Sequence, residues 1–267
     1  MGIKTIIKSN KRLYEIALKT YMMRDLFFNF SKAPWYIKSI KQFKKMSRDD
    51  TGGHRFNEFK LYPILRDRDA TAGTVDLYLT QDLWAAQKIS KLSKEETHFD
   101  IGSRVDGFIT HLLSFRDNIT LIDIRPLPYF IDEGLDFIQA DATNLDNIKD
   151  DSVFSLSALC SLEHFGLGRY GDPIDPQACF RAFKAIQRVL KPGGILYLSL
   201  PIGRERIEYN AHRIFFPNTV IDCFDNMELI EFSVATADPK KPLIENPGIH
   251  DFDEAEHYFG LFEFIKR

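Results

Sequence analysis

The stretch HFDIGSRVDGFITHL, residues 98–112, decides the fold class of this chain. An apolar run ends at an acid, Asp100, and a helical pattern begins a few residues later. The turn between them holds the small residues Gly102, Ser103 and Gly107. Strand, small-residue turn and helix in this order are typical of a nucleotide pocket. Arg104 and Asp106 stand where a full glycine fingerprint would carry glycines, so this stretch leaves the nucleotide open.

Apolar strands alternate with helical stretches from residue 96 onward. Strands are expected at 97–102, 119–124, 135–141, 152–159, 195–201, 227–235 and 257–267, and helices at 105–115 and 176–190. The second half of 61–92 also predicts a helix, with Leu83, Trp84 and Ile89 on one face and Asp82 in its first turn. This alternation predicts a mostly parallel sheet with helices on both faces. Ligands bind such sheets outside the carboxyl ends of the strands.

Length and composition set the broad class. The 267 residues are 44% hydrophobic, which is enough for one large domain with or without an appendage. No apolar run approaches the ~20 residues of a membrane span, and the first thirty residues show no secretion signal. The three cysteines show no CxxC spacing, so we expect no zinc site. Free thiols fit a cytoplasmic protein.

Charge is distributed unevenly along the chain. Residues 1–50 hold 12 Lys and Arg against 4 Asp and Glu, whereas the remainder holds 23 against 34. We therefore expect a basic helical extension over 1–50 and an acidic domain over 51–267, separated by the turn-rich SRDDTGGH at 47–54. The extension either packs on the body or lies on an anionic membrane surface, at the inner face of the membrane. The acidity of the body argues against a nucleic-acid partner.

Three acids occupy matching places on successive strands. Asp100 ends the first, Asp123 lies near the end of the second, and Asp141 ends the third. Each alone fits a helix cap, but three in register predict a rim of carboxylates. An acid after the second strand suits a ribose diol, and one after the third suits an exocyclic amine. Asp106 would face the pyrophosphate of NAD, so the rim favours a cationic sulfonium cofactor, S-adenosylmethionine.

Several segments resemble class I S-adenosylmethionine-dependent methyltransferases over about residues 80–267. These are FDIG, LIDI, QADATNL, SALCSLEHFG, AIQRVLKPGGILYLSLP and the closing strand pair. The resemblance implies a Rossmann-like sheet in the order 3-2-1-4-5-7-6 with the last strand antiparallel. It also implies the cofactor-binding residues Asp100, Gly102, Ser103, Gly107, Asp123, Ile124, Asp141, Ala142 and Leu159.

More narrowly, the chain is similar to a methyltransferase-like family of uncharacterised function, DUF268. The segments that carry this similarity are YLTQDLWAAQKI, DIGSRVDGF, LIDIRPL, EHFGLGRYGDP, NAHRIFFP and GLFEFIKR. The similarity implies that DIGSRVDG is this group's own version of the loop. It also implies a setting near surface-polysaccharide or glycan synthesis, although fold does not fix function.

Two polar loops follow the fourth and fifth strands, SLEHFGLGRYGDPID and PIGRERIEYNAHRIFFP. His164 is a candidate base or a packing residue, and His212 is a candidate for substrate contact. The other candidate substrate-binding residues are Glu163, Tyr170, Arg204, Arg206 and Asn210. The arginines either hold an anionic group or are simply solvated. By analogy with the group, Gln81, Asp82 and Trp84 fold over the cofactor, whereas Trp84 fits a core position equally well.

The function expected from these features is S-adenosylmethionine-dependent methyl transfer to oxygen or nitrogen of a small molecule or glycan precursor. Two alternatives stay open: a non-catalytic Rossmann-like binding protein, and an NAD(P)-dependent enzyme on a similar sheet. The sequence predicts neither the acceptor nor the oligomeric state.

Overall fold

The computed structural model describes residues 19–20, 22–24, 27–49, 58–127 and 133–267. The chain forms two compact units, residues 1–74 (unit 1) and residues 75–267 (unit 2). The boundary expected at residue 50 lies outside the described residues, as does the extension before residue 19.

An eight-stranded sheet forms the centre of unit 2. Its strands are β1 His98–Ile101, β2 Ile119–Asp123, β3 Leu135–Gln139, β4 Val153–Leu159, β5 Leu190–Ile202, β8 Met227–Ala235, β9 Leu243–Glu245 and β10 Tyr258–Lys266. They lie in the order β3-β2-β1-β4-β5-β10-β8-β9. The first five pair in parallel, and β10 is antiparallel to both β5 and β8. The predicted order 3-2-1-4-5-7-6 is thereby confirmed, with β9 added at one edge.

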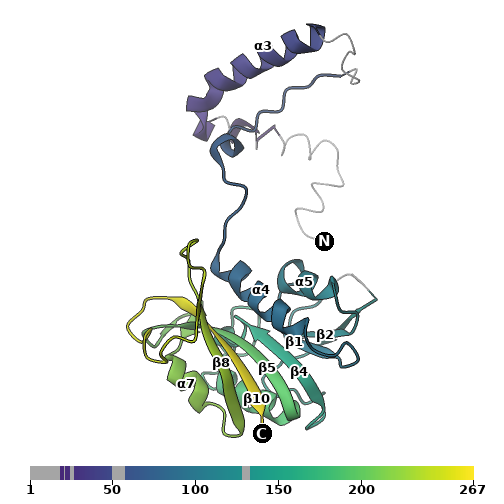
Figure 1. Cartoon of the computed structure of the whole chain (residues 1–267), viewed down its shortest axis with the longest axis vertical. Helices are drawn as coiled ribbons and strands as arrows, with labels where there is room; N and C mark the ends of the chain where they lie inside the picture. Colours follow the sequence, from purple (N-terminus) through teal and green to yellow (C-terminus); the bar gives the residue numbers. More distant parts are fainter. Residues whose placement is uncertain (1–18, 21, 25–26, 50–57, 128–132) are drawn as a thin grey trace. The chain divides into compact units, whose positions relative to one another are not determined.

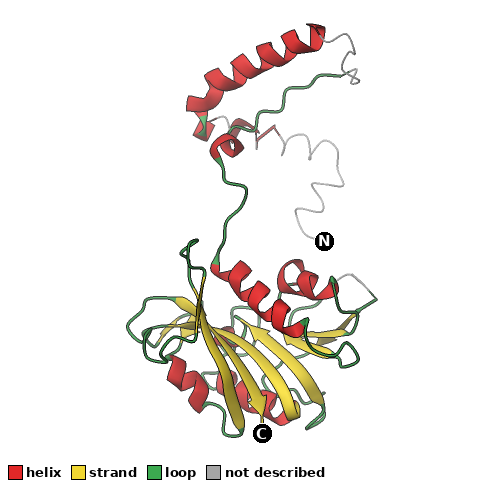
Figure 2. Cartoon of the chain, viewed as in Figure 1, coloured by secondary structure: helices red, strands yellow, loops and turns green. Residues whose placement is uncertain are grey.

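Helices cover both faces of this sheet (Figures 1 and 2). One face carries α4 Leu77–Ile89, the π-helical turn η3 Val105–Ile109 and α5 Thr110–Leu113, whereas the other carries α6 Ala178–Val189 and α7 Pro217–Asp222. Along β5, Leu196, Leu198 and Leu200 pack on the α6 side and Tyr197 packs on the α4 side. This alternation, with side chains pointing to opposite faces of the strand, produces two hydrophobic cores.

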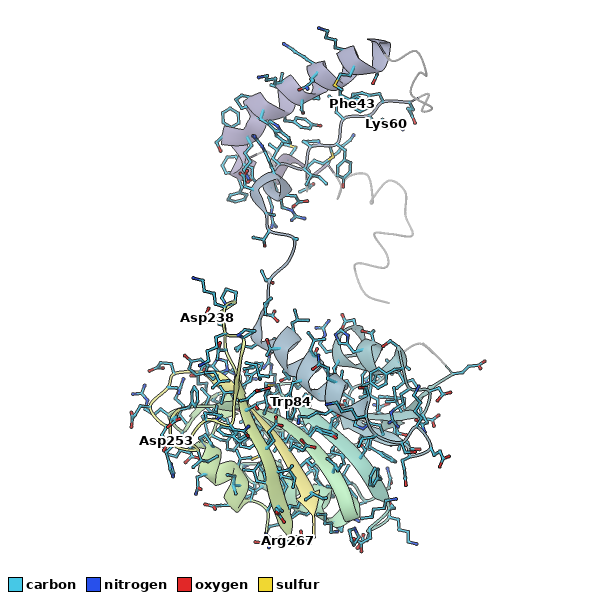
Figure 3. The ribbon with its side chains drawn as sticks, in the orientation of Figure 1. Phe43, Lys60, Trp84, Asp238, Asp253 and Arg267 are labelled. Atoms are coloured by element: carbon cyan, nitrogen blue, oxygen red, sulfur yellow. The ribbon has the colours of Figure 1, made fainter. Side chains whose placement is uncertain are left out.

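The helix α4 differs from the expectation in where it begins. Asp76 is its N-cap, because its carboxylate accepts a hydrogen bond of 2.8 Å from the Leu79 backbone N–H. Trp84 (Figure 3) and Ile89 are buried as predicted. Leu83 is exposed, so this one residue was assigned to the wrong face of the helix. Asp82 lies in mid-helix rather than in the first turn.

The following elements are the remaining ones with defined bounds in the described structure. In unit 1 these are η1 Phe30–Lys32, α3 Ala33–Asp49 and η2 Arg66–Asp69; in unit 2 they are η4 Leu162–His164 and a two-stranded ribbon of β6 Arg206–Glu208 and β7 His212–Ile214. Among the described helices, none is long and apolar enough to cross a membrane.

Candidate functional site

A cavity of about 790 Å³ opens at the carboxyl ends of β1 to β4. The turns that follow each of these four strands line it, and α4 closes one side with Tyr78, Gln81 and Asp82. Ligand pockets in proteins typically measure roughly 300–1,000 Å³, so this one has room for a nucleoside and more. Its place at the strand ends is the one that parallel sheets use for ligands.

The turn after β1 is held from below by a buried carboxylate. Asp100 is fully buried and accepts from the Ser103 backbone N–H (3.0 Å), the Ser103 hydroxyl (3.0 Å) and the Ser157 hydroxyl (2.5 Å). Burial raises the pKa of Asp100 to about 6, so the group is ionised at neutral pH. Asp100 therefore shapes the turn, and it is not among the described residues that line the cavity.

A buried histidine extends this network down the sheet. His98 lies between two serines of the neighbouring strand, with Nδ1 2.8 Å from Ser155 Oγ and Nε2 2.9 Å from Ser157 Oγ. The register of β1 and β4 places them so, because His98 pairs with Ser155 and Asp100 with Ser157. Since the Ser157 hydroxyl donates to the ionised Asp100, His98 must donate to Ser157 through Nε2–H. Burial lowers the pKa of His98 to about 3 and keeps the ring neutral.

Gly102 is required by packing as well as by backbone conformation. Its φ is +81°, a region that L side chains rarely adopt. A Cβ at this position would lie 2.9 Å from the Ser161 Cβ, which is too close for any real contact. Ser161 follows β4 and lines the cavity, and its buried Oγ has no hydrogen-bond partner in the described structure. The two turns thus meet at one point and leave a hydroxyl available to a ligand.

The acid after β2 is paired with an arginine. Asp123 receives the Arg125 guanidinium through Nε (3.0 Å to Oδ1) and Nη2 (2.5 Å to Oδ2). The same guanidinium lies 4.6 Å from the centre of the Tyr170 ring, on the loop that follows η4. Asp123, Arg125 and Tyr170 all line the cavity, so this contact joins the turn after β2 to the loop after β4.

The acid after β3 is partly used by its own turn. Asp141 Oδ1 accepts from the Thr143 backbone N–H at 2.8 Å. This is the capping role that a lone aspartate after a strand often takes. The residue also lines the cavity together with Ala142 and Thr143, so the carboxylate serves the turn and faces the ligand space at once.

The loop after β4 is a rigid structure. The Asp172 carboxylate accepts from the backbone N–H groups of Gly166 (2.8 Å), Gly168 (3.1 Å) and Tyr170 (3.1 Å). The buried Arg213 of β7 donates to the carbonyl oxygens of Glu163, Phe165 and Pro176. Glycines with φ of +76° and +71° at 166 and 168 permit the tight path.

His164 lines the cavity in a defined tautomer. Its Nδ1 lies 2.6 Å from the Ala211 carbonyl oxygen, which can only accept, so Nδ1 carries the proton and Nε2 carries the lone pair. Burial and, to a smaller extent, the charge of Arg169 lower the pKa of His164 to about 4. Arg169 also lines the cavity, and its Nη1 donates to the Ala211 carbonyl oxygen at 3.0 Å. It forms no ion pair with a carboxylate among the described residues.

Glu163 lies behind His164 rather than in the cavity lining. It is buried, its Oε1 is 3.4 Å from His164 Nε2, and its Oε2 has no hydrogen-bond partner in the described structure. Burial raises the pKa of Glu163 to about 8, so the acid is mostly protonated at neutral pH. A neutral acid beside a neutral histidine avoids an unpaired buried charge.

Apart from Asp100 and Glu163, which lie outside the cavity lining, the predicted site residues divide into two groups. The cavity brings together Gly102, Ser103, Gly107, Asp123, Ile124, Asp141, Ala142, Leu159, His164 and Tyr170. The β6–β7 ribbon, its turn and the residues just before it hold Arg204, Arg206, Asn210 and His212, none of which is among the described lining residues. Their role in substrate binding stays a prediction.

Other side chains of this protein pair with most of the polar side chains in and beside the ribbon. Arg204 pairs with Glu256 (2.9 Å) and Arg206 with Glu208 (2.8 Å). His212 Nε2 lies 3.1 Å from Glu208 Oε2, out of line for a hydrogen bond, and its ring stacks on His257 at 5.4 Å. Its ring centre is 6.4 Å from that of His164, so the ribbon borders the site.

Sequence reasoning missed several polar residues of the cavity: Tyr78, Ser161, Arg125 and Arg169. Arg125 sits two residues after the predicted ribose acid, and Arg169 precedes Tyr170, so both lay inside segments that had been singled out. Chain position alone does not show that their guanidinium groups turn toward Tyr170, at 4.6 Å and 5.2 Å from its ring centre.

Residues 138–243 match a family model described as "Caenorhabditis protein of unknown function, DUF268". That segment is DUF268-like. It contains β4, η4, the rigid loop and the β6–β7 ribbon, and it leaves out the β1 turn and Asp123. The DUF268-like segment therefore carries the side of the cavity that holds His164 and Arg169.

Solved structures of similar fold include three methyltransferases. N-methyltransferase NodS from Bradyrhizobium japonicum, in complex with S-adenosylhomocysteine, is 13% identical, with 75% of this chain and 90% of that chain covered and a TM-score of 0.48. An S-adenosylmethionine-dependent methyltransferase from Thermotoga maritima is 19% identical, with coverages of 72% and 91% and a TM-score of 0.48.

The third, the Burkholderia thailandensis 1,6-didemethyltoxoflavin-N1-methyltransferase, is 15% identical, with coverages of 69% and 78% and a TM-score of 0.44. A search of curated proteins gives no match. The strand order of unit 2 is itself that of a Rossmann-like class I methyltransferase sheet.

Proposed function

We propose that this protein transfers a methyl group from S-adenosylmethionine to oxygen or nitrogen of a small molecule or glycan precursor. The observation that carries the proposal is a single cavity that joins the Asp123 and Asp141 carboxylates to a neutral histidine, His164, on a rigid loop. The first part suits a nucleoside, and the second suits proton transfer from an acceptor.

The residues present fit the cofactor on chemical grounds. Asp123 and Asp141 would hold the ribose hydroxyls and the adenine amine, and the unpartnered Ser161 hydroxyl would meet the amino-acid end. Burial raises the pKa of Asp82, which faces the cavity from α4, so a cationic neighbour would stabilise its charged form. The bound cofactor supplies an electrophilic methyl group on a positively charged sulfur.

His164 is the candidate for handling the acceptor's proton. Its Nδ1–H is held by the Ala211 carbonyl, so the lone pair of Nε2 is fixed in direction. The lowered pKa keeps the ring neutral at neutral pH, so its Nε2 carries a lone pair rather than a proton. Most of the rate effect in such a displacement comes from positioning the two partners, which the rigid loop around Asp172 favours.

A specific observation keeps a phosphate-bearing nucleotide as a second candidate. The Asp106 carboxylate is paired with Arg104 at 2.7 Å, so its negative charge is partly neutralised. Arg125 does the same for Asp123. The charge argument against NAD(P) is therefore weaker in the folded protein than it is in the sequence.

Isothermal titration calorimetry of the full chain with S-adenosylhomocysteine, NADH and NADPH separates the two candidates. We expect saturable binding of S-adenosylhomocysteine alone. Binding of a dinucleotide without S-adenosylhomocysteine would replace methyl transfer by a redox function. Binding of none of the three would leave the non-catalytic alternative and overturn the proposal.

A further inference from the structure

Unit 1 exposes apolar side chains that a folded unit normally buries. Among its described residues only Pro63 and Leu65 are buried. Its exposed large apolar side chains are Met23, Phe27, Phe28, Phe30, Trp35, Ile37, Phe43, Met46, Phe59, Leu61, Tyr62 and Ile64. Soluble proteins rarely expose contiguous apolar patches of more than a few hundred Å², so a surface of this kind marks an interaction site.

The helix α3 separates these side chains from a row of lysines. At 100° per residue, Trp35, Tyr36, Ile40, Phe43 and Met46 fall on one side of the helix. Lys38, Lys41 and Lys45 fall on the opposite side together with Ile37, and Lys44 lies at the border. The first turn of the helix contains no acid. The helix is thus amphipathic, with a polar face that is basic.

The segment after α3 extends its apolar face without closing it (Figure 3). The Phe59 ring stacks on Phe43 with centres 5.8 Å apart, and Lys44 lies 5.0 Å from the Phe59 ring centre. Arg68 lies 4.4 Å from the Trp35 ring. Phe59 itself stays 45% exposed, so the contact joins two apolar strips into one wider surface.

The chemistry of this surface selects its occupant. Lysine on one face with tryptophan and phenylalanine on the other is the pattern of helices that lie in a membrane interface. Lysines near an anionic lipid surface are attracted by its negative potential, and the aromatic rings enter the headgroup region. Unit 1 of a second copy would bring the same lysines and be repelled. A nucleic-acid backbone would pair with the lysines and leave the apolar face uncovered.

We infer that unit 1 binds the surface of an anionic lipid bilayer, with α3 lying in the plane of the interface. This inference goes beyond methyl transfer and does not depend on it. It assigns the apolar side chains a hydrocarbon and headgroup environment, and it assigns the lysines the lipid phosphates. Binding then weakens with rising salt, because the charged part of the attraction is screened.

Vesicle co-sedimentation of the full chain tests the inference. The probes are vesicles of phosphatidylcholine alone and vesicles of phosphatidylcholine with phosphatidylglycerol in equal parts. The apolar variant is Phe43→Ser with Met46→Ser, two side chains of the apolar face that are 54% and 62% exposed. The charge variant is Lys38→Glu with Lys41→Glu. We expect each to bind the anionic vesicles about tenfold more weakly than wild type, or weaker still.

Matched controls make the same chemical changes in unit 2. Ile207→Ser with Ile230→Ser removes two exposed isoleucines, and Lys149→Glu with Lys184→Glu reverses two exposed lysines. We expect both controls to pellet like wild type, and circular dichroism checks that every variant keeps its helix content. The inference is overturned if the wild-type chain stays in the supernatant at low salt, or if α3 variants and controls pellet equally. Pelleting without lipid through self-association, or binding to nucleic acid in place of vesicles, overturns it as well.

Discussion

The Arg125 guanidinium donates hydrogen bonds to both carboxylate oxygens of Asp123, from Nε to Oδ1 at 3.0 Å and from Nη2 to Oδ2 at 2.5 Å. A carboxylate that is to hold a ribose diol is therefore already engaged by a cation. Two roles of Asp123 follow from this geometry. It either accepts hydrogen bonds from the cofactor through its remaining lone pairs, or it acts indirectly by fixing Arg125 beside Tyr170.

A double-mutant cycle separates these roles. We expect Asp123→Ala to weaken S-adenosylhomocysteine binding by about 1–3 kcal/mol, because polar groups of the ligand lose their partner. If Asp123 contacts the ligand directly, Arg125→Ala alone keeps an affinity close to that of wild type. If Asp123 acts by fixing Arg125, Arg125→Ala alone binds as weakly as Asp123→Ala, and the double variant binds no more weakly than either. Recovery of wild-type affinity in the double variant would show that the single substitution acts only by leaving Arg125 unpaired. Calorimetry gives all four affinities of the cycle.

A second prediction concerns Gly102. We expect Gly102→Ala to destabilise the fold and to weaken binding of S-adenosylhomocysteine, because its Cβ would lie 2.9 Å from the Ser161 Cβ. The positive φ adds about 1–2 kcal/mol. Ser161→Gly in the same chain removes the collision but not the backbone term, so we expect partial recovery of the melting temperature. Full recovery would mean that backbone conformation plays no part, and no recovery would remove the packing explanation.

A third prediction follows from the raised pKa of Glu163. Burial raises this pKa from 4.5 to about 8, so between these values the folded protein holds a proton that the unfolded chain has released. The contribution of Glu163 to the free energy of unfolding is therefore fully present below pH 4.5 and is lost as the pH rises through 8. Glu163→Gln keeps a neutral side chain at every pH. We expect its melting temperature, relative to wild type, to rise from pH 5 to about pH 8 and then to level off.

The control for that experiment is Glu95→Gln, which changes an exposed acid in the same way. Its melting temperature relative to wild type should stay nearly constant over the same pH range. A flat difference for Glu163→Gln as well would show that Glu163 is not held neutral by burial.

The strands could be predicted because they are apolar runs, whereas their order was implied by the resemblance to class I methyltransferases. Met227–Ala235, for example, has the bounds expected for the sixth strand. The start of α4 was missed although its signal is local, since Asp76 stands directly before the apolar Leu77. The helix after β1 was expected to be regular, but it opens with a π turn around Gly107.

The candidate site could be predicted only where its residues follow strand ends. Gly102, Asp123 and Asp141 do so, and parallel strands bring such positions to one edge. The loop after β5 instead folds into a ribbon. Arg204, just before the ribbon, pairs with Glu256 from a distant part of the chain. A pairing across fifty residues leaves no local pattern. The role of His98 was hidden for a similar reason, because its serine partners lie on another strand.

The last prediction concerns the two neutral histidines of the site, which carry their protons on opposite nitrogens. Long-range ¹H–¹⁵N NMR at neutral pH should show the Nε2–H tautomer for His98 and the Nδ1–H tautomer for His164. Ser157→Ala removes the acceptor of the His98 proton, so we expect its tautomer preference to weaken while that of His164 is unchanged. Arg169→Gln removes a charge that lowers the pKa of His164, so this pKa should rise from about 4. A His164 that is Nε2-protonated in wild type would leave no lone pair on that atom for an acceptor's proton, and the proposed base would be lost.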